Sequence, residues 1–417
     1  YWEDAGQPTS QVAARVCYTD TVHDVLIVGG ASYLLIDSLH GYYPLYRYDG
    51  THWDTLGLFG GTINTAVVFR DTLIVGGAFK TIHGDTIERV ACYVNGGWHP
   101  YGNIDNGSYV GSVRTLRVLE GELYALGTFQ HVTGQPCNGV AKRFGGHWEC
   151  LPSLPEFYGT PYMYDIARFQ GKLVVAGNFM TLDETIYDMM QFDGTSWLAV
   201  CDNCMRGGMD GAAALIVYQD ELYMGGRYYY GGGNAGQGIM RWDGEEWNPV
   251  GPVEHGVQLD NYSDQYPPSI YGFQIRDGRL FFNGEAGFVN HMPTPGIASW
   301  DGTDFCNLGD GDLGLTASAF AFYHDSLYVS TGPSGTIGRG LVRYLSTDFQ
   351  EECSTLPVDE VPVSAEETFQ VAWSPSGELT LLGLTDGVHR LRIHDPQGRL
   401  VLLKMFAARP VVVKLLH

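Results

Sequence analysis

The chain has 417 residues, of which 44% are hydrophobic and 56 are glycine, and its 24 Lys and Arg against 47 Asp and Glu give a formal net charge of −23. This length exceeds one ordinary core and indicates several domains or a repeat array. The charge argues against a nucleic-acid partner, because phosphate binding needs clustered Lys and Arg. No apolar run reaches the ~18 residues that a membrane-spanning helix needs.

Residues 1–6 resemble the last of four short segments that recur along the chain, but the other three segments of that unit do not precede them. The chain starts at Tyr1 without Met, as expected if an export signal has been removed. Trp2 lies 51 residues before Trp53, one full repeat. We expect this segment to complete the last unit and remove a free strand edge. The alternative is that Phe349 supplies that strand and Trp2 packs at the margin.

Four short apolar segments recur along the chain. In one unit they cover residues 65–69, 73–77, 90–94 and 98–102. Such segments, bounded by turn residues, are typical of β-strands, and no helical periodicity is found. The second segment of the unit recurs at residues 26–30, 123–127, 173–177, 222–226, 280–284 and, more weakly, 327–331.

An aromatic residue marks the fourth segment of each unit. These residues are Trp53, Trp98, Trp148, Trp197, Trp247, Phe305 and Phe349. They recur at intervals of 44 to 58 residues. Four short strands in units of ~40–50 residues predict an all-β, seven-bladed β-propeller over residues 1–353.

The stretch Trp242–Gly251 illustrates how a unit ends. An acidic run between Trp242 and Trp247 could bind a sugar or a metal ion. The Asp243-Gly244 dipeptide recurs in other units, however, so we interpret it as a two-residue hairpin turn of type I′. Trp247 is then expected to pack within its blade.

The chain has eight cysteines, and an even number fits disulfides in an exported protein. Cys201 and Cys204 have C-x-x-C spacing. No second such pair exists, which favours a local disulfide or two free thiols over a zinc site.

Residues 354–367 are rich in proline and acidic residues and are interpreted as a linker. Alternating segments then return and predict a small Ig-like β-sandwich over residues 368–417. Its expected strands lie at residues 370–373, 378–382, 389–393, 398–403 and 411–415.

Two resemblances follow from these patterns. The segments 222–226, 239–244 and 247–251, with their counterparts, resemble kelch-like propeller repeats, which implies a fold without a function. The segment after Trp373 resembles the C-terminal sorting domain of type IX secretion cargo from Bacteroidota, although Trp373-Ser374 replaces the usual Pro-Asn. The matching residues are Pro375, Gly377, Asp395, Gly398 and Lys414.

The second resemblance implies export to the cell surface or the medium in association with the outer membrane. Its implied partners are an outer-membrane barrel, on which the tail docks, and a sortase that cleaves in the linker. Cofactors are not expected, and metal sites are not assigned. A calcium ion near Asp310 and Asp312 is one interpretation, with a polar turn between blades as the alternative.

Function is expected where the repeats differ, in long loops that combine tyrosine with Asn, Gly and Asp, residues suited to adaptable recognition. The candidate ligand-face residues are Tyr158, Tyr162, Tyr228, Tyr229, Tyr230, Asn234, Asp260, Tyr262 and Tyr266. The alternative for any single tyrosine is packing between blades. The pattern favours a protein- or glycan-binding module without assigned catalytic residues. The alternatives are a polysaccharide-active enzyme and a structural subunit of a surface complex.

Overall fold

A computed structural model gives the three-dimensional structure of the chain as two compact units, Tyr1–Thr355 and Leu356–His417. The described residues are all β-strands and connections, without a helix and hence without a helix able to cross a membrane. They are residues 2–6, 14–31, 34–35, 41–105, 111–201, 208–231, 233–251, 259–260, 269–285, 288–289, 292–294, 296–308, 317–331, 340–345, 352–354, 370–373, 378–382, 388–394, 400–407 and 411–414.

The first unit is built from one antiparallel pattern. In one sheet the pairing order is β7 (Ile63–Phe69), β8 (Thr72–Gly77), β11 (Val90–Val94) and β12 (Gly97–Pro100). These strands confirm the segments predicted from the sequence. Short hairpin connections and alternating apolar residues produce this arrangement because each strand can bury one or both faces against its neighbours.

The same order recurs along the chain. Five further groups of four strands pair in this order. They are β2 (Ala14–Asp20), β3 (Val25–Gly30), β5 (Gly41–Tyr48), β6 (Trp53–Phe59); β14 (Val113–Leu119), β15 (Glu122–Gly127), β18 (Val140–Phe144), β19 (His147–Cys150); β20 (Tyr162–Phe169), β21 (Lys172–Met180), β22 (Tyr187–Phe192), β23 (Trp197–Ala199); β24 (Gly208–Tyr218), β25 (Glu221–Tyr228), β26 (Ile239–Trp242), β27 (Trp247–Pro249); β29 (Ser269–Arg276), β30 (Arg279–Glu285), β33 (Ile297–Trp300), β34 (Phe305–Asn307).

The last sheet of the first unit joins the two ends of that unit. It runs from β35 (Ala317–Tyr323) through β36 (Ser326–Thr331) and β37 (Leu341–Tyr344) to β1 (Trp2–Asp4). Trp2 pairs with Tyr344, and Glu3 forms an ion pair with Arg343. The N-terminal strand therefore covers the edge of β37. Phe349, the alternative outer-strand residue, lies outside the described residues.

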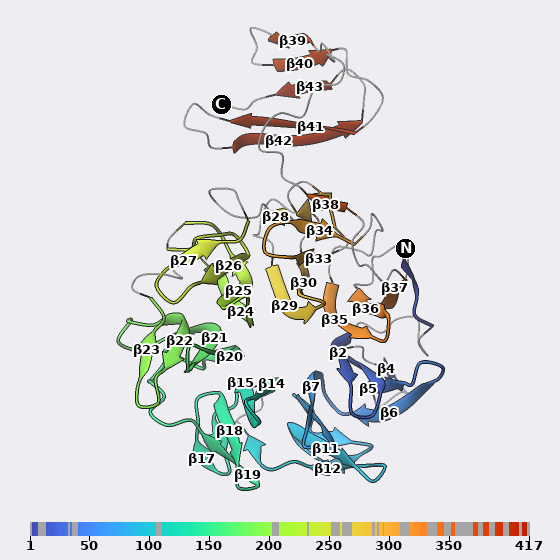
Figure 1. Cartoon of the computed structure of the whole chain (residues 1–417), viewed down its shortest axis with the longest axis vertical. Helices are drawn as coiled ribbons and strands as arrows, with labels where there is room; N and C mark the ends of the chain where they lie inside the picture. Colours follow the sequence, from blue (N-terminus) through green and yellow to red (C-terminus); the bar gives the residue numbers. More distant parts are fainter. Residues whose placement is uncertain are drawn as a thin grey trace. The chain divides into compact units, whose positions relative to one another are not determined.

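The sheets stand around a common centre in a propeller-like arrangement (Figure 1). Their first strands line this centre and contact one another in the order β2, β7, β14, β20, β24, β29 and β35, and β35 returns to β2. Apolar clusters fill the spaces between neighbouring sheets. One of them combines Ile74 with Leu116 and Trp148.

In six of the sheets, a tryptophan of the outer strand connects the sheet to the one before it. The indole Nε1–H of Trp98 donates to the Leu56 carbonyl at 3.0 Å, and that of Trp2 donates to the Leu308 carbonyl at 2.7 Å. The corresponding bonds elsewhere are Trp53 to the Ala5 carbonyl, Trp148 to the Tyr101 carbonyl, Trp197 to the Pro152 carbonyl and Trp247 to Cys201 Sγ.

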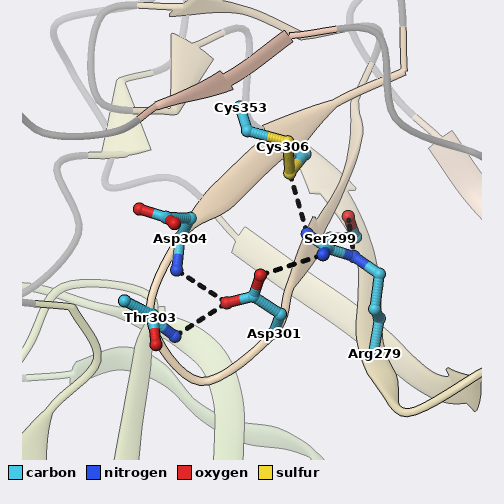
Figure 2. The surroundings of a disulfide bond; sticks show 7 residues. All are labelled: Arg279, Ser299, Asp301, Thr303, Asp304, Cys306 and Cys353. Carbon is cyan, nitrogen blue, oxygen red and sulfur yellow. Dashed lines mark hydrogen bonds and ion pairs between the residues drawn. A yellow bond between two sulfur atoms is a disulfide. The ribbon is translucent and has the colours of Figure 1, made fainter.

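Phe305 takes the tryptophan position in the sheet of β29, and this sheet has a different reinforcement. The short strand β38 (Glu352–Ser354) pairs with β34, and a disulfide joins Cys306 to Cys353 (Figure 2). Arg279 donates to Cys306 Sγ at 2.8 Å and forms an ion pair with Asp301 at 3.0 Å. This fifth strand was not predicted from the sequence.

The other cysteines differ in state. Cys137 and Cys150 form a disulfide, and Cys201 is also disulfide-bonded. Cys17 and Cys92 are buried thiols. Cys204 lies outside the described residues.

The prediction of a two-residue turn at Asp243-Gly244 is wrong. Trp242 pairs with Trp247, so four residues form the loop. The Asp243 carboxylate accepts the N–H groups of Glu245 and Glu246, both at 2.8 Å, and these bonds stabilise the longer loop. Asp49, Asp193 and Asp301 cap equivalent loops.

Two-residue turns do occur in this position of other sheets. Asn95 and Gly96 have φ of 51° and 80° and connect the pair formed by Val94 and Gly97. These angles are those of a type I′ turn, which Asn-Gly favours. The pairs Tyr93–Trp98 and Trp242–Trp247 have the same spacing, so Asp243 takes the place of Val94 and the two loops differ in whether that residue continues the strand pairing.

The second unit consists of strands at nearly the positions predicted for them. One sheet contains β39 (Gln370–Trp373), β40 (Glu378–Leu382) and β43 (Val411–Lys414), and a second contains β41 (Val388–His394) and β42 (Leu400–Ala407). All described pairings are antiparallel. Most of the predicted linker, residues 355–367, lies outside the described residues, whereas Ser354 belongs to β38.

We expect Trp2→Phe to lower the free energy of unfolding by about 1–3 kcal/mol, because the buried Leu308 carbonyl loses its donor. Trp247→Phe is the matched control. It also removes an indole N–H donor, but the acceptor there is Cys201 Sγ, and sulfur is a weak acceptor. The loss in free energy of unfolding should therefore be smaller. Chemical denaturation measures both variants, and equal losses would contradict a role for the indole hydrogen bond.

Asp193 should make stability sensitive to acid. Hydrogen bonds from the Ser196 backbone and from Thr195 lower the pKa of Asp193 to about 2. Because the unfolded carboxyl has a pKa of about 3.9, its stabilisation is complete above pH 4 and is lost as the pH falls through 2. In Asp193→Asn, the urea concentration at the unfolding midpoint should fall less between pH 4 and pH 2 than it does in the unsubstituted protein. An unchanged dependence of the urea midpoint on pH would exclude this contribution of Asp193.

Candidate functional site

The first strands enclose a central channel with a volume of about 720 Å³. Side chains from β2, β7, β14, β20, β24, β29 and β35 all line it. A concave space surrounded by rigid strands is the usual form of a small-molecule site. We therefore identify this channel as the candidate functional site.

A β-bulge near the start of each first strand shapes the channel. In β14, for example, the pairing with β15 skips one residue between Val113 and Thr115. The same shift occurs in each of the six remaining first strands. A bulge leaves its extra residue unpaired and redirects its side chain. The skipped residues that line the channel are Arg15, Asn64, Arg114, Tyr164, Ala213, Tyr271 and Ser318. We call them the bulge ring.

Arg15 and Arg114 are the two cations of the bulge ring, and both are exposed to the channel. Arg15 donates to Asn64 Oδ1 at 3.1 Å. The Arg114 guanidinium lies over the Tyr164 ring, 4.7 Å from its centroid. Among the described residues, neither arginine forms an ion pair with a carboxylate.

A third channel arginine, Arg117, is neutralised by Asp165. The guanidinium donates Nε to Asp165 Oδ1 at 2.9 Å and Nη2 to Oδ2 at 2.5 Å. Only 3% of Asp165 is exposed, and its carboxylate also accepts the N–H groups of Ile166 and Leu215. The Asp165 charge raises the pKa of Arg117. This pair joins three sheets and is structural.

Further hydrogen bonds between sheets hold the bulge ring in place. Thr115 donates to the Tyr164 carbonyl at 2.6 Å, and Ser318 donates to the Ala14 carbonyl at 2.9 Å. Burial and a hydrogen bond to Glu285 raise the pKa of Tyr271, so this hydroxyl stays protonated. The channel wall is therefore fixed before any ligand enters.

The side chains of the predicted tyrosine-rich loops differ in how far they are buried. Tyr228 is buried, and its hydroxyl donates to the Met224 carbonyl at 3.0 Å. Asn234 is also buried and donates to the Tyr229 carbonyl. Tyr229 and Tyr230 are 40% and 49% exposed. Among the described residues of this loop, Tyr229 and Tyr230 are the side chains that present substantial surface to a ligand.

Of the other candidates, Tyr158 and Tyr162 are about half exposed. Tyr162 lies near the channel, since its ring centroid is 6.4 Å from that of Tyr164. Asp260 lies in β28 (Leu259–Asp260), and Lys414 lies in β43. Several candidates lie outside the described residues: Tyr262, Tyr266, Pro375, Gly377, Asp395 and Gly398.

The described part of the chain contains no cluster of three or more His, Cys, Asp or Glu suited to a metal ion. Asp310 and Asp312, the candidates for calcium, lie outside it.

Sequence reasoning missed the bulge ring. Its members occupy one repeat position, at intervals of about 50 residues, but their side chains differ in charge, size and polarity. A search for repeated residues therefore passes over them. The available signal was the scarcity of Lys and Arg in this acidic chain, together with the equivalent positions of Arg15 and Arg114 in their units.

A scan against protein-family models and a search of curated proteins found no match. Among solved structures, the computationally designed Ika8 protein is 13% identical with a TM-score of 0.43, and the alignment covers 81% of this chain and 98% of that chain. YjhT is 14% identical with a TM-score of 0.34, and 80% and 94% are covered. A Trypanosoma rangeli sialidase in complex with DANA is 11% identical with a TM-score of 0.35, and 81% and 56% are covered. These distant likenesses assign no activity.

We expect Asp165→Ala to destabilise the protein by about 3–5 kcal/mol, because it leaves Arg117 and two buried N–H groups without their acceptor. Asp54→Ala is the control, since Asp54 pairs with Arg47 at the surface, where an ion pair contributes at most about 1 kcal/mol. Denaturant unfolding compares the two. Similar small losses would show that the Asp165 contacts do not hold the sheets together.

Proposed function

We propose that residues 1–355 form a seven-bladed β-propeller that acts as an exported binding module, with a protein or glycan ligand held in the central channel. The observation that carries this proposal is the bulge ring. One backbone device recurs in every first strand, while its side chain changes from strand to strand. Variation on a fixed scaffold is typical of recognition surfaces.

The chemistry of the channel favours binding over hydrolysis. Glycosidases use two carboxyl groups that face each other across the scissile bond. Asp165 is the carboxylate in the described lining of the channel, and Arg117 and two backbone N–H groups hold it. A carboxylate fixed in this way is suited to joining sheets.

For the second unit we propose an Ig-like sorting domain of the type IX system, which delivers the protein to the cell surface. The proposed partners are an outer-membrane barrel and a sortase. The strand positions in residues 370–414 support an independent small β-domain. The disulfides support an oxidising compartment, where such bonds persist.

Ligand binding is tested by closing the channel. A glycan array and a set of immobilised peptides are probed with the full chain and with Ala213→Trp, which places a large side chain in the bulge ring. We expect bound probes to be lost by this variant and kept by Leu198→Trp, at an exposed position outside the channel. Binding that survives Ala213→Trp would exclude the channel. Release of sugar products would favour the enzyme alternative.

Export is tested by deleting residues 369–417 in a host with type IX secretion. We expect the truncated chain to accumulate in the periplasm, folded and oxidised, whereas the full chain reaches the surface. Cell fractionation and surface protease treatment measure this distribution. A truncated chain that still reaches the surface would show that the tail is not the sorting signal.

A further inference from the structure

The channel carries positive charge in a strongly acidic protein. The chain has a net charge of −23, but the charged residues in the described lining of the channel are three arginines and one aspartate. Asp165 neutralises Arg117, which leaves Arg15 and Arg114. A concave site with one sign of charge concentrates ligands of the opposite sign.

The structure holds these two arginines in position. Asn64 accepts a hydrogen bond from Arg15 with its oxygen and donates its amide nitrogen to the Val113 carbonyl at 2.9 Å. Val113 directly precedes Arg114 on β14. Asn64 therefore links Arg15 to the strand that carries Arg114, and the Tyr164 ring supports the Arg114 guanidinium from the next sheet.

The two charges are unfavourable for the protein alone. Desolvation lowers the pKa of Arg114, the interaction with Tyr164 opposes this shift, and the charge of Arg15 adds to it. Two cations that repel each other, without a carboxylate partner among the described residues, lose stability that an anion between them would restore. Functional sites commonly contain such a conflict.

The neighbours of the arginines resemble a site for a sugar more than a site for a simple ion. A volume of about 720 Å³ is many times that of a carboxylate or sulfate group. The half-buried Tyr164 and Tyr271 offer aromatic surface, and the side-chain oxygens of Asn64 and Ser318 keep lone pairs that can accept from a ligand hydroxyl. The lining combines polar and apolar surface in similar amounts, which suits an oligosaccharide better than an apolar ligand.

We infer that the channel binds an acidic sugar, with Arg15 and Arg114 contacting its carboxylate or sulfate and the bulge-ring tyrosines contacting the sugar ring. Guanidinium groups present paired N–H donors that match both anions. The inference rests on the proposed binding function and specifies the class of its ligand.

Isothermal titration calorimetry tests the inference with oligomers of galacturonate, glucuronate and sulfated galactose. Methyl-esterified galacturonate is the matched neutral probe. We expect at least one acidic probe to bind, to weaken about tenfold or more on esterification or desulfation, and to weaken at higher salt. A preference for the uronates would identify the carboxylate as the recognised group, and a preference for the sulfated oligomer would identify sulfate.

Variants assign the contact to the two arginines. Arg15→Gln and Arg114→Gln should each weaken the best probe about tenfold. Arg70→Gln is the matched control, because Arg70 also lies over an aromatic ring, that of Phe69 at 4.9 Å, but outside the channel lining. The variant that combines Arg15→Gln with Arg114→Gln should retain its melting temperature, because the repulsion between the two arginines is removed. A large drop would indicate a structural role and overturn the inference.

The outcomes separate this inference from the proposed function. Equal binding of acidic and esterified oligomers, lost in Ala213→Trp, would overturn the acidic-sugar inference and leave the channel as the binding site. Binding unaffected by Ala213→Trp would overturn the channel function itself. If none of the acidic oligomers binds, the inference fails, whatever the array shows for other ligands.

Discussion

The hydrogen bond from an outer-strand tryptophan to the preceding sheet is the interaction on which the first unit depends. A tryptophan contributes a large apolar surface and a single N–H donor, so it both packs and fixes an orientation. Trp2, Trp53 and Trp98 each place that donor on a carbonyl of the previous sheet. Where Phe305 lacks the donor, a covalent link between Cys306 and Cys353 and an added strand occur in the same sheet.

A scaffold fixed from outside leaves the inner strands available for recognition. The bulge is a backbone feature, and it places a side chain in the channel whichever residue occupies the position. Arg15, Tyr164 and Ala213 have little in common except that position. The hydrogen bonds between first strands hold the wall in one geometry, so different side chains can be combined there without a change in the fold.

Much of the fold could be predicted from the sequence, because short apolar segments and regularly spaced aromatics depend on local patterns. Even the weak segment 327–331 forms β36. The loops at Asp243 and its equivalents were predicted wrongly, since the carboxylate that caps them acts through contacts that dipeptide preferences do not express. The Tyr228 side chain was assigned to a surface but is buried. The channel arginines were missed, because they become neighbours only when distant strands close into a ring.

The pairing of β1 with β37 also has a consequence for folding kinetics. Glu3 meets Arg343 across 340 positions of sequence, so β1 can pair with β37 only when the two ends of the first unit come together. Contacts of such separation are slow to form. Until then the edge of β37 is an unpaired strand, which is prone to aggregation. The interval before ring closure is thus the one in which a chaperone would protect this protein most.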